Sequence, residues 1–463
     1  MVARSAFPAL KARVGGDPGW RGLIQGTGVA LVLRIGGAGL GLAFNLLLAR
    51  SAGAEGAGLF FLAFSVSGLL ALASRLGLDA IVVRRTAAAA AKGEWLAVRA
   101  DAHAALAITL IAAGVASVGL WLLAPLVSEA VFHKPELVPA MRGLVFAILP
   151  IALSVIFAEL LRGLHSLVRS QALQALVAGA VALPLLGLFV GDFGIGAAVW
   201  AQVAGNSVAC ALGAWWWRDE IRAKGAAMNP DASAPAVASR ARYLHLLGAA
   251  RPLFYFSMLG ALMGTLDILV LGKLGSATDV GIYAIAVRLA MLTSFILLAS
   301  NSYAGPYFAA AYAKRDLDAL HLLAIRSAQV TALAATPLLI LFVALPSTLL
   351  GFFGREFIAG APVLMVLAVG QFVNVVTGSA GQVLIMAGHE RDMRNASFLA
   401  AAVTIAGLVA LVPKWGALGA AMATAGGVVT QKLVATMLVH KRLGLTVHAF
   451  ARPRRTAGTD EHR

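Results

Sequence analysis

The stretch "FYFSMLGALMGTLDILVLG", residues 254–272, contains a single charged residue, Asp267, among apolar and small residues. As a helix with a rise of 1.5 Å per residue, it would be roughly 28 Å long, about the thickness of the hydrocarbon core of a bilayer. A carboxylate that faces lipid at that depth costs at least ~2.5 kcal/mol. We therefore expect this segment to cross a membrane, with Asp267 facing the protein interior together with Gly260 and Gly264.

The composition of the whole chain predicts many such crossings. Of its 463 residues, 60% are hydrophobic and only 13% are charged. Soluble proteins average about 45–50% apolar and about 25% charged residues. Cys210 is the single cysteine in the sequence, which excludes an intrachain disulfide and disfavours a metal site built on cysteines.

Apolar runs long enough to cross a bilayer alternate with polar breaks along the chain. They lie at about 23–49, 56–83, 100–127, 138–161, 170–190, 194–217, 252–272, 280–304, 321–345, 358–386, 395–413 and 416–439. We predict an all-α integral membrane protein with about twelve transmembrane helices.

Lysine and arginine collect on one side of this predicted arrangement. With an even number of helices, both tails share a side, and the loops on that side hold most of the basic residues, so this side is predicted to be cytoplasmic. A basic surface that faces anionic lipids accounts for the net charge of +16 without nucleic acid. The predicted domains are a basic tail (1–22), a six-helix lobe (23–217), a cytoplasmic linker (218–245), a second six-helix lobe (246–440) and a second basic tail (441–463).

The two predicted lobes repeat each other in sequence. "LLARSAGAEGAGLFFLAFSV" (47–66) aligns with "LVLGKLGSATDVGIYAIAVR" (269–288), which matches Gly58 with Gly281. "GIGAAVWA" (194–201) aligns with "ALGAAMAT" (417–424) at the same offset of 222 to 223 residues. Six helices followed by six in the same orientation form a parallel repeat.

Three charged residues fall inside the predicted membrane segments. Arg34 lies on a small, polar face of the first helix that also contains Asn45. Arg288 and Asp267, on the eighth and seventh helices, are predicted at similar depth. One interpretation is an ion pair that joins the two helices, and another is that Asp267 positions Arg288 or titrates during transport; the two interpretations do not exclude each other. The positions equivalent to Asp267, Arg288 and Arg34 in the other half hold Phe44, Ser65 and Ser257. The repeated scaffold therefore does not require the charges.

The tenth predicted helix has a longer polar face. Gln371, Asn374, Gly378 and Gln382 share one side of it. These side chains either form hydrogen bonds between helices or bind sugar hydroxyl groups of a substrate.

Two long segments resemble a known family. "LARSAGAEGAGLFFLAFSVSGLLALASRLGLDAIVVR" (48–84) and "LDILVLGKLGSATDVGIYAIAVRLAML" (266–292) are similar to helices of Wzx-type polysaccharide-repeat-unit flippases. These belong to the multidrug/oligosaccharidyl-lipid/polysaccharide (MOP) exporter superfamily. "AELLRGLHS" (158–166) and "GALGAAMATA" (416–425) fit the same family. The resemblance implies two lobes around a central cavity that opens alternately to each side.

The resemblance also implies a substrate on an undecaprenyl diphosphate carrier, with its diphosphate bound by cavity arginines, a role that Arg34 and Arg288 would match. Two arginines against one aspartate leave the interior positive, and a guanidinium binds phosphate oxygens bidentately. The expected cavity residues are Arg34, Asn45, Asp267, Arg288, Gln371 and Asn374.

We therefore expect a transporter and not an enzyme, located in the bacterial inner membrane. It would flip a lipid-linked oligosaccharide for polysaccharide or lipopolysaccharide biosynthesis. We expect no cofactor or metal, and an H⁺ or Na⁺ gradient is the candidate driving force. The expected partners are the substrate, membrane lipids and polysaccharide-assembly proteins, without nucleic acid.

The main alternative is a cation-coupled multidrug extruder of the same superfamily, followed by a peptidoglycan-precursor flippase. A membrane-embedded glycosyltransferase would need clustered carboxylates and long outer loops, which the sequence lacks.

Overall fold

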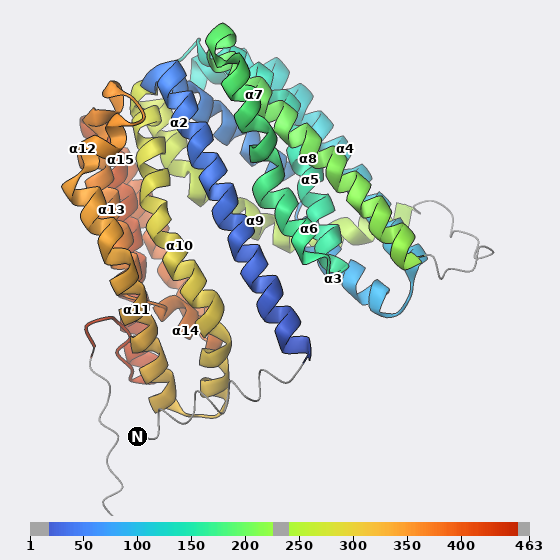
Figure 1. The fold of residues 1–463 in the computed structure, drawn as a ribbon, viewed down its shortest axis with the longest axis vertical. Helices are drawn as coiled ribbons and strands as arrows, with labels where there is room; N and C mark the ends of the chain where they lie inside the picture. The colour runs from blue at the N-terminus through green and yellow to red at the C-terminus, as the bar shows by residue number, and fades with distance from the viewer. Residues whose placement is uncertain (1–17, 226–239, 452–463) are drawn as a thin grey trace, which may run out of the picture. The chain divides into compact units, whose positions relative to one another are not determined.

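The computed structural model describes residues 18–225 and 240–451, and within these two ranges the chain is helical and contains no strand (Figure 1). The remaining parts of the predicted tails and linker, at 1–17, 226–239 and 452–463, lie outside the described residues. The predicted all-α fold is confirmed.

Ten of the described helices are long and apolar enough to cross a membrane. Two of them, α2 (Pro18–Ser74) and α15 (Glu390–Leu443), are each a pair of helices joined at a glycine with non-helical backbone, Gly53 and Gly416. If each pair is counted as two segments, the described part of the chain has the predicted twelve.

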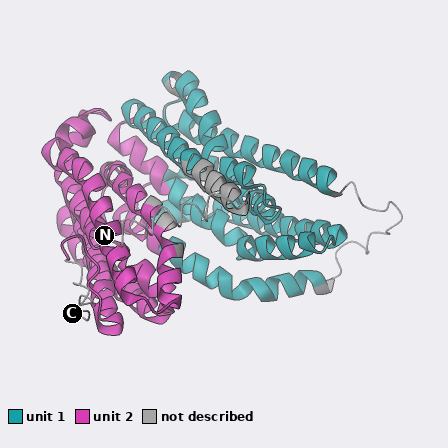
Figure 2. Cartoon of the chain, turned by 60° about the horizontal axis from the view of Figure 1, so that its bottom comes forward, with its two compact units in different colours: residues 1–51, 63–130, 135–262 teal, residues 52–62, 131–134, 263–463 magenta. Residues whose placement is uncertain are grey.

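The helices form two compact units, coloured separately in Figure 2. Unit 1 comprises residues 1–51, 63–130 and 135–262. Besides most of α2 and the first part of α9 (Arg240–Leu274), it contains α3 (Leu78–Ala91), α4 (Trp95–Leu126), α5 (Leu137–Gly163), α6 (Leu167–Ala172), α7 (Ala178–Phe193) and α8 (Ile195–Gly225), with π-helical turns η1 (Val127–Val131) and η2 (Leu173–Val177). Helix α5 lies at its centre, packed against α3, α4 and α8.

Unit 2 comprises residues 52–62, 131–134 and 263–463, of which those up to 451 are described. It contains the last part of α9, α10 (Ala277–Ala313), α11 (Leu317–Ala344), α12 (Pro346–Gly351), the 3₁₀ turn η3 (Arg355–Gly360), α13 (Ala361–Val376), α14 (Ala380–Met386) and α15. Helix α13 packs against α10, α11 and α15. Short segments of each predicted lobe thus pack with helices of the other.

The outward side of unit 1 is apolar, as a helix facing lipid requires. On α4, Ile111, Val115 and Leu122 follow one another at helical spacing and are 67%, 69% and 62% exposed. Soluble monomers rarely expose contiguous apolar surface of this kind. The exposed stripe therefore supports a membrane-spanning role for α4.

The backbone carries the repeat that the sequence predicts. Left-handed residues occur at equivalent turns of the two halves, separated by 222 or 223 positions. The pairs are Gly93 with Arg315, His165 with Gly388, and Gly194 with Gly416. Since non-glycine residues seldom adopt this conformation, the agreement at Arg315 and His165 reflects a shared loop geometry.

The matched glycines Gly58 and Gly281 lie directly against each other within unit 2. A Cβ atom on Gly58 would collide with the carbonyl oxygen of Ala277, and one on Gly281 would collide with that of Ala54. Ala54 and Ala277 are themselves repeat-equivalent, so the contact is reciprocal about a local pseudo-two-fold axis. Each helix can approach the other this closely because neither has a side chain at the contact.

The tenth predicted helix is interrupted, which the sequence analysis did not predict. Helices α13 and α14 are separated by a turn at Gly378, whose φ is +63°. The carbonyl of Val376 accepts a hydrogen bond from the backbone N–H of Ala449, 2.9 Å away. The segment 444–451 after α15 thus packs onto the interruption, and its Leu445 and Val447 are fully buried.

Candidate functional site

Asp267 lies in a chain of hydrogen bonds that joins three helices of unit 2. The Tyr283 hydroxyl on α10 donates to Asp267 Oδ2 over 2.6 Å and lies 2.9 Å from Thr424 Oγ1 on α15. The other carboxylate oxygen accepts from the N–H of Ile268 at 2.9 Å. Since the single tyrosine proton goes to Asp267, the Thr424 hydroxyl donates to Tyr283. The side chain of Tyr283 is fully buried.

The first half of the repeat has no counterpart to this polar chain. The positions equivalent to Asp267, Tyr283 and Thr424 hold Phe44, Phe60 and Ala201, all buried. The fold is therefore compatible with apolar residues at all three positions. The sequence pattern indicates Asp267 but not Tyr283 or Thr424, which a position-by-position comparison of the two halves could have found.

Arg288 and Asp267 form no direct ion pair in the described part of the chain. Arg288 Nη1 instead donates to the Ala284 carbonyl at 2.9 Å, and its guanidinium carbon lies 4.0 Å from the centre of the Phe61 ring. An aromatic face attracts a cation without neutralising its charge. Of the two predicted alternatives, the ion pair is thus wrong for this structure.

Arg34 lies in unit 1, where a neutral side chain binds it. Its Nε donates to Oε1 of Gln171 on α6 over 3.0 Å. One turn further along α2, Gly37 packs directly against the backbone of Ala175 in η2, so the small face of this helix allows a close approach. Asn45, the other predicted residue of this face, is 8% exposed.

On the tenth predicted helix, Gln371 forms a hydrogen bond between helices. Its Oε1 accepts from Ser294 Oγ of α10 at 2.7 Å and from Asn374 Nδ2 at 3.0 Å. The Oδ1 atom of Asn374 is buried and has no hydrogen-bond partner among the described residues. Gln371 thus joins helices, whereas Asn374 retains an unused acceptor.

The predicted site residues are therefore brought together only in part. Gln371 and Asn374 contact each other within unit 2, which also holds Asp267 and Arg288. Arg34 and Asn45 lie in unit 1. Within residues 18–225 and 240–451, no three His, Cys, Asp or Glu side chains cluster as a metal ion would require.

The fold is shared with transporters of the MOP superfamily. An inward-facing multidrug resistance MATE family transporter is 16% identical, with a TM-score of 0.70 over 89% of this chain and 98% of the other. The lipid II flippase MurJ, in an inward closed conformation, is 13% identical, with a TM-score of 0.70 over 90% of this chain and 87% of the other. A MOP superfamily transporter from Pyrococcus furiosus is 16% identical, with a TM-score of 0.63 over 93% of this chain and 97% of the other. The apolar helices together with this fold define a multi-pass membrane protein that shares the fold of these transporters.

The sequence gives a narrower classification of the chain than the fold does. Residues 23–311 match the polysaccharide biosynthesis protein family, and the chain belongs to that family. No curated protein matches the sequence closely enough to refine this assignment.

Proposed function

We propose that this protein flips a lipid-linked oligosaccharide, carried on undecaprenyl diphosphate, across the bacterial inner membrane by alternating access. Both termini would be cytoplasmic, and the product would enter polysaccharide or lipopolysaccharide biosynthesis. Membership of the polysaccharide biosynthesis family and the fold shared with MurJ support a flippase. The substrate class rests on the chemistry of the two arginines inside apolar helices.

The observation that carries the proposal is that neither arginine is paired with an acid among the described residues. Arg34 is bound by the amide of Gln171, and Arg288 by a backbone carbonyl and the ring of Phe61. Each contact positions a guanidinium without a directly bonded carboxylate, and Asp267 acts on Arg288 only electrostatically, without an ion-pair contact. Arg34 is exposed and Arg288 is half-buried, and an arginine within an apolar membrane segment is costly without a counter-ion, which favours an anionic substrate group as that counter-ion. A diphosphate offers a guanidinium bidentate acceptors.

The same charges argue against the multidrug alternative. A cavity for cationic drugs should expose surplus carboxylates and aromatic faces. Here the carboxylate of Asp267 already accepts a hydrogen bond from Tyr283, and the face of Phe61 is occupied by Arg288. In our proposal, Asp267 is the candidate group through which an H⁺ or Na⁺ gradient would drive transport.

The test is complementation of a deletion strain with Arg34→Ala and Arg288→Ala. Arg142→Ala is the matched control, because Arg142 also lies over an aromatic ring, that of Trp121, with 5.0 Å between its guanidinium carbon and the ring centre. Removing a charge-assisted contact of about 1.5–3 kcal/mol should reduce export about 10-fold or more. The readouts are surface polysaccharide and lipid-bound oligosaccharide on the inner leaflet, with membrane insertion checked for each variant.

We expect both test variants to accumulate lipid-bound oligosaccharide and the control to export normally. Wild-type export by Arg34→Ala and Arg288→Ala would remove the arginines from the mechanism. Drug sensitivity of the deletion strain with unchanged surface polysaccharide would favour a multidrug extruder instead.

A further inference from the structure

The contact between Arg34 and Gln171 uses one particular part of the guanidinium. An arginine presents five N–H donors along two edges, one that includes Nε and one formed by the two terminal nitrogens. Gln171 Oε1 accepts from Nε at 3.0 Å and so occupies the first edge. The terminal edge, which can bind two oxygens of a phosphate in parallel, remains for a ligand.

Gln171 is itself held in a fixed place. It is 8% exposed, and it lies on α6 directly before the π-helical turn η2. Helix α2 is pinned against that turn, because Gly37 packs on the backbone of Ala175 and a Cβ on Gly36 would lie 3.3 Å from Leu176. The distance between Arg34 and Gln171 is thus set by backbone packing. π-Helical turns of this kind are frequent at functional sites.

The pair is specific to the first half of the chain. The position equivalent to Arg34 holds Ser257, and the position equivalent to Gln171 holds Arg394. A contact required by the repeated scaffold would have a counterpart in the second half. The choice of an amide also matters, because a carboxylate here would bind Nε but cancel the positive charge that an anion requires.

We propose that Gln171 is a positioning residue, which holds the guanidinium of Arg34 so that its terminal edge faces the diphosphate of the lipid carrier. This inference rests on the proposed function, since it assigns Arg34 an anionic ligand. Gln171 acts only through Arg34 and does not touch the ligand. Its contribution is therefore expected to vanish when Arg34 is absent.

A double-mutant cycle on the purified full-length protein tests this, with undecaprenyl diphosphate as the probe and its Kd as the readout. Gln171→Met removes the acceptor but keeps the size of the side chain. We expect it to raise the Kd about 5-fold, the value of one lost positioning hydrogen bond of about 1 kcal/mol. In the Arg34→Ala background, Gln171→Met should change the Kd less than about 2-fold.

Gln174→Met is the matched control, because Gln174 lies one turn further along and binds Glu159 Oε1 at 3.1 Å rather than Arg34. It should leave the Kd within about 2-fold of wild type, and thermal melting identifies any variant that fails to fold. An equal effect of Gln171→Met with and without Arg34 would show a merely structural role and overturn the inference. The inference would also be overturned if Arg34→Ala weakens binding but Gln171→Met leaves the Kd unchanged. Unchanged binding by Arg34→Ala would overturn the role of Arg34 in the proposed function as well.

Discussion

Among single residues, Tyr283 distinguishes the two halves of the repeat most directly, because its equivalent, Phe60, differs from it only by the hydroxyl group. Tyr283→Phe should therefore fit the fold while leaving Asp267 and Thr424 without their shared partner. A hydrogen bond to a charged group contributes about 1.5–3 kcal/mol. We expect export of lipid-linked oligosaccharide to fall about 10-fold, measured by complementation of a deletion strain.

Phe60→Tyr serves as the control in the reverse direction. It introduces the hydroxyl at a buried position, and the residues equivalent to Asp267 and Thr424, which are Phe44 and Ala201, are apolar, so it should reduce thermal stability without a gain in export. Full export by Tyr283→Phe would show that the hydrogen-bond chain is only structural.

Some of these residues could be predicted from the sequence and others could not. Asp267 is evident because a lone charge in a stretch of nineteen residues that is otherwise apolar and small is costly and so needs a reason. Tyr283, Thr424 and Gln171 are uncharged, so none of them has the high cost that marks a lone charge in an apolar segment. Their importance depends on which side chains the fold brings within hydrogen-bond distance.

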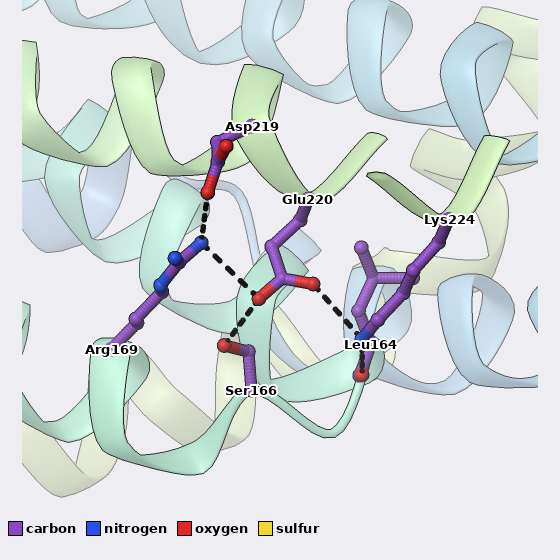
Figure 3. Close-up of polar contacts among 6 residues, drawn as sticks. All are labelled: Leu164, Ser166, Arg169, Asp219, Glu220 and Lys224. Atoms are coloured by element: carbon purple, nitrogen blue, oxygen red, sulfur yellow. Dashed lines mark hydrogen bonds and ion pairs between the residues drawn. The ribbon is translucent and has the colours of Figure 1, made fainter. Parts of the chain in front are cut away.

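At the scale of helices, the two halves of the repeat form ion pairs at equivalent positions near helix ends, with the positive and the negative residue exchanged. In unit 1, Arg169 at the start of α6 binds Asp219 near the end of α8, 2.7 Å away, within the cluster shown in Figure 3. In unit 2, the equivalent positions are Asp392 and Arg442, at the two ends of α15, and they pair at 2.7 Å. The signs are reversed while the geometry is kept.

Exchanging the pair in unit 2, by Asp392→Arg with Arg442→Asp, would copy the polarity of unit 1. Each single change places like charges together and should lower the melting midpoint of the purified protein by about 2 °C. The double exchange should recover at least half of that loss, because it restores opposite charges. If the double variant melts no higher than the single variants, the ion pair does not stabilise the contact between these helix ends.

Two features of the helices, the contact between Gly58 and Gly281 and the interruption at Gly378, could not be predicted from the sequence. The match of Gly58 with Gly281 indicated equivalent positions, but not that the two glycines face each other, since an alignment carries no information on distance. The interruption at Gly378 was missed because the run 358–386 contains no charged residue, and a glycine within such a run does not by itself end a helix. What allows the interruption is the Ala449 N–H, which binds the freed carbonyl of Val376 from a segment distant in sequence.

For the molecule as a whole, hydropathy alone was sufficient to predict the number of crossing segments, because a bilayer requires long apolar helices with internally paired backbones. It did not predict the path of residues 444–451. This segment is short and only moderately apolar, so its burial depends on the surface that unit 2 offers it. Leu445 and Val447 fill that surface beside Phe308 and Leu320.

Truncation after Leu443 removes this segment and tests its role. It withdraws the hydrogen bond from Ala449 to Val376, the contact of Thr446 O with His321 Nε2 at 3.1 Å, and the buried side chains of Leu445 and Val447. Burial of two such side chains contributes about 1.5–3 kcal/mol each. We expect the melting midpoint to fall by about 5 °C or more and export to decrease, because the interruption between α13 and α14 loses its backbone partner. Truncation after Ala451 keeps the whole segment and should melt like the full chain. Equal melting of the two truncated proteins would show that α13 and α14 hold their arrangement without it.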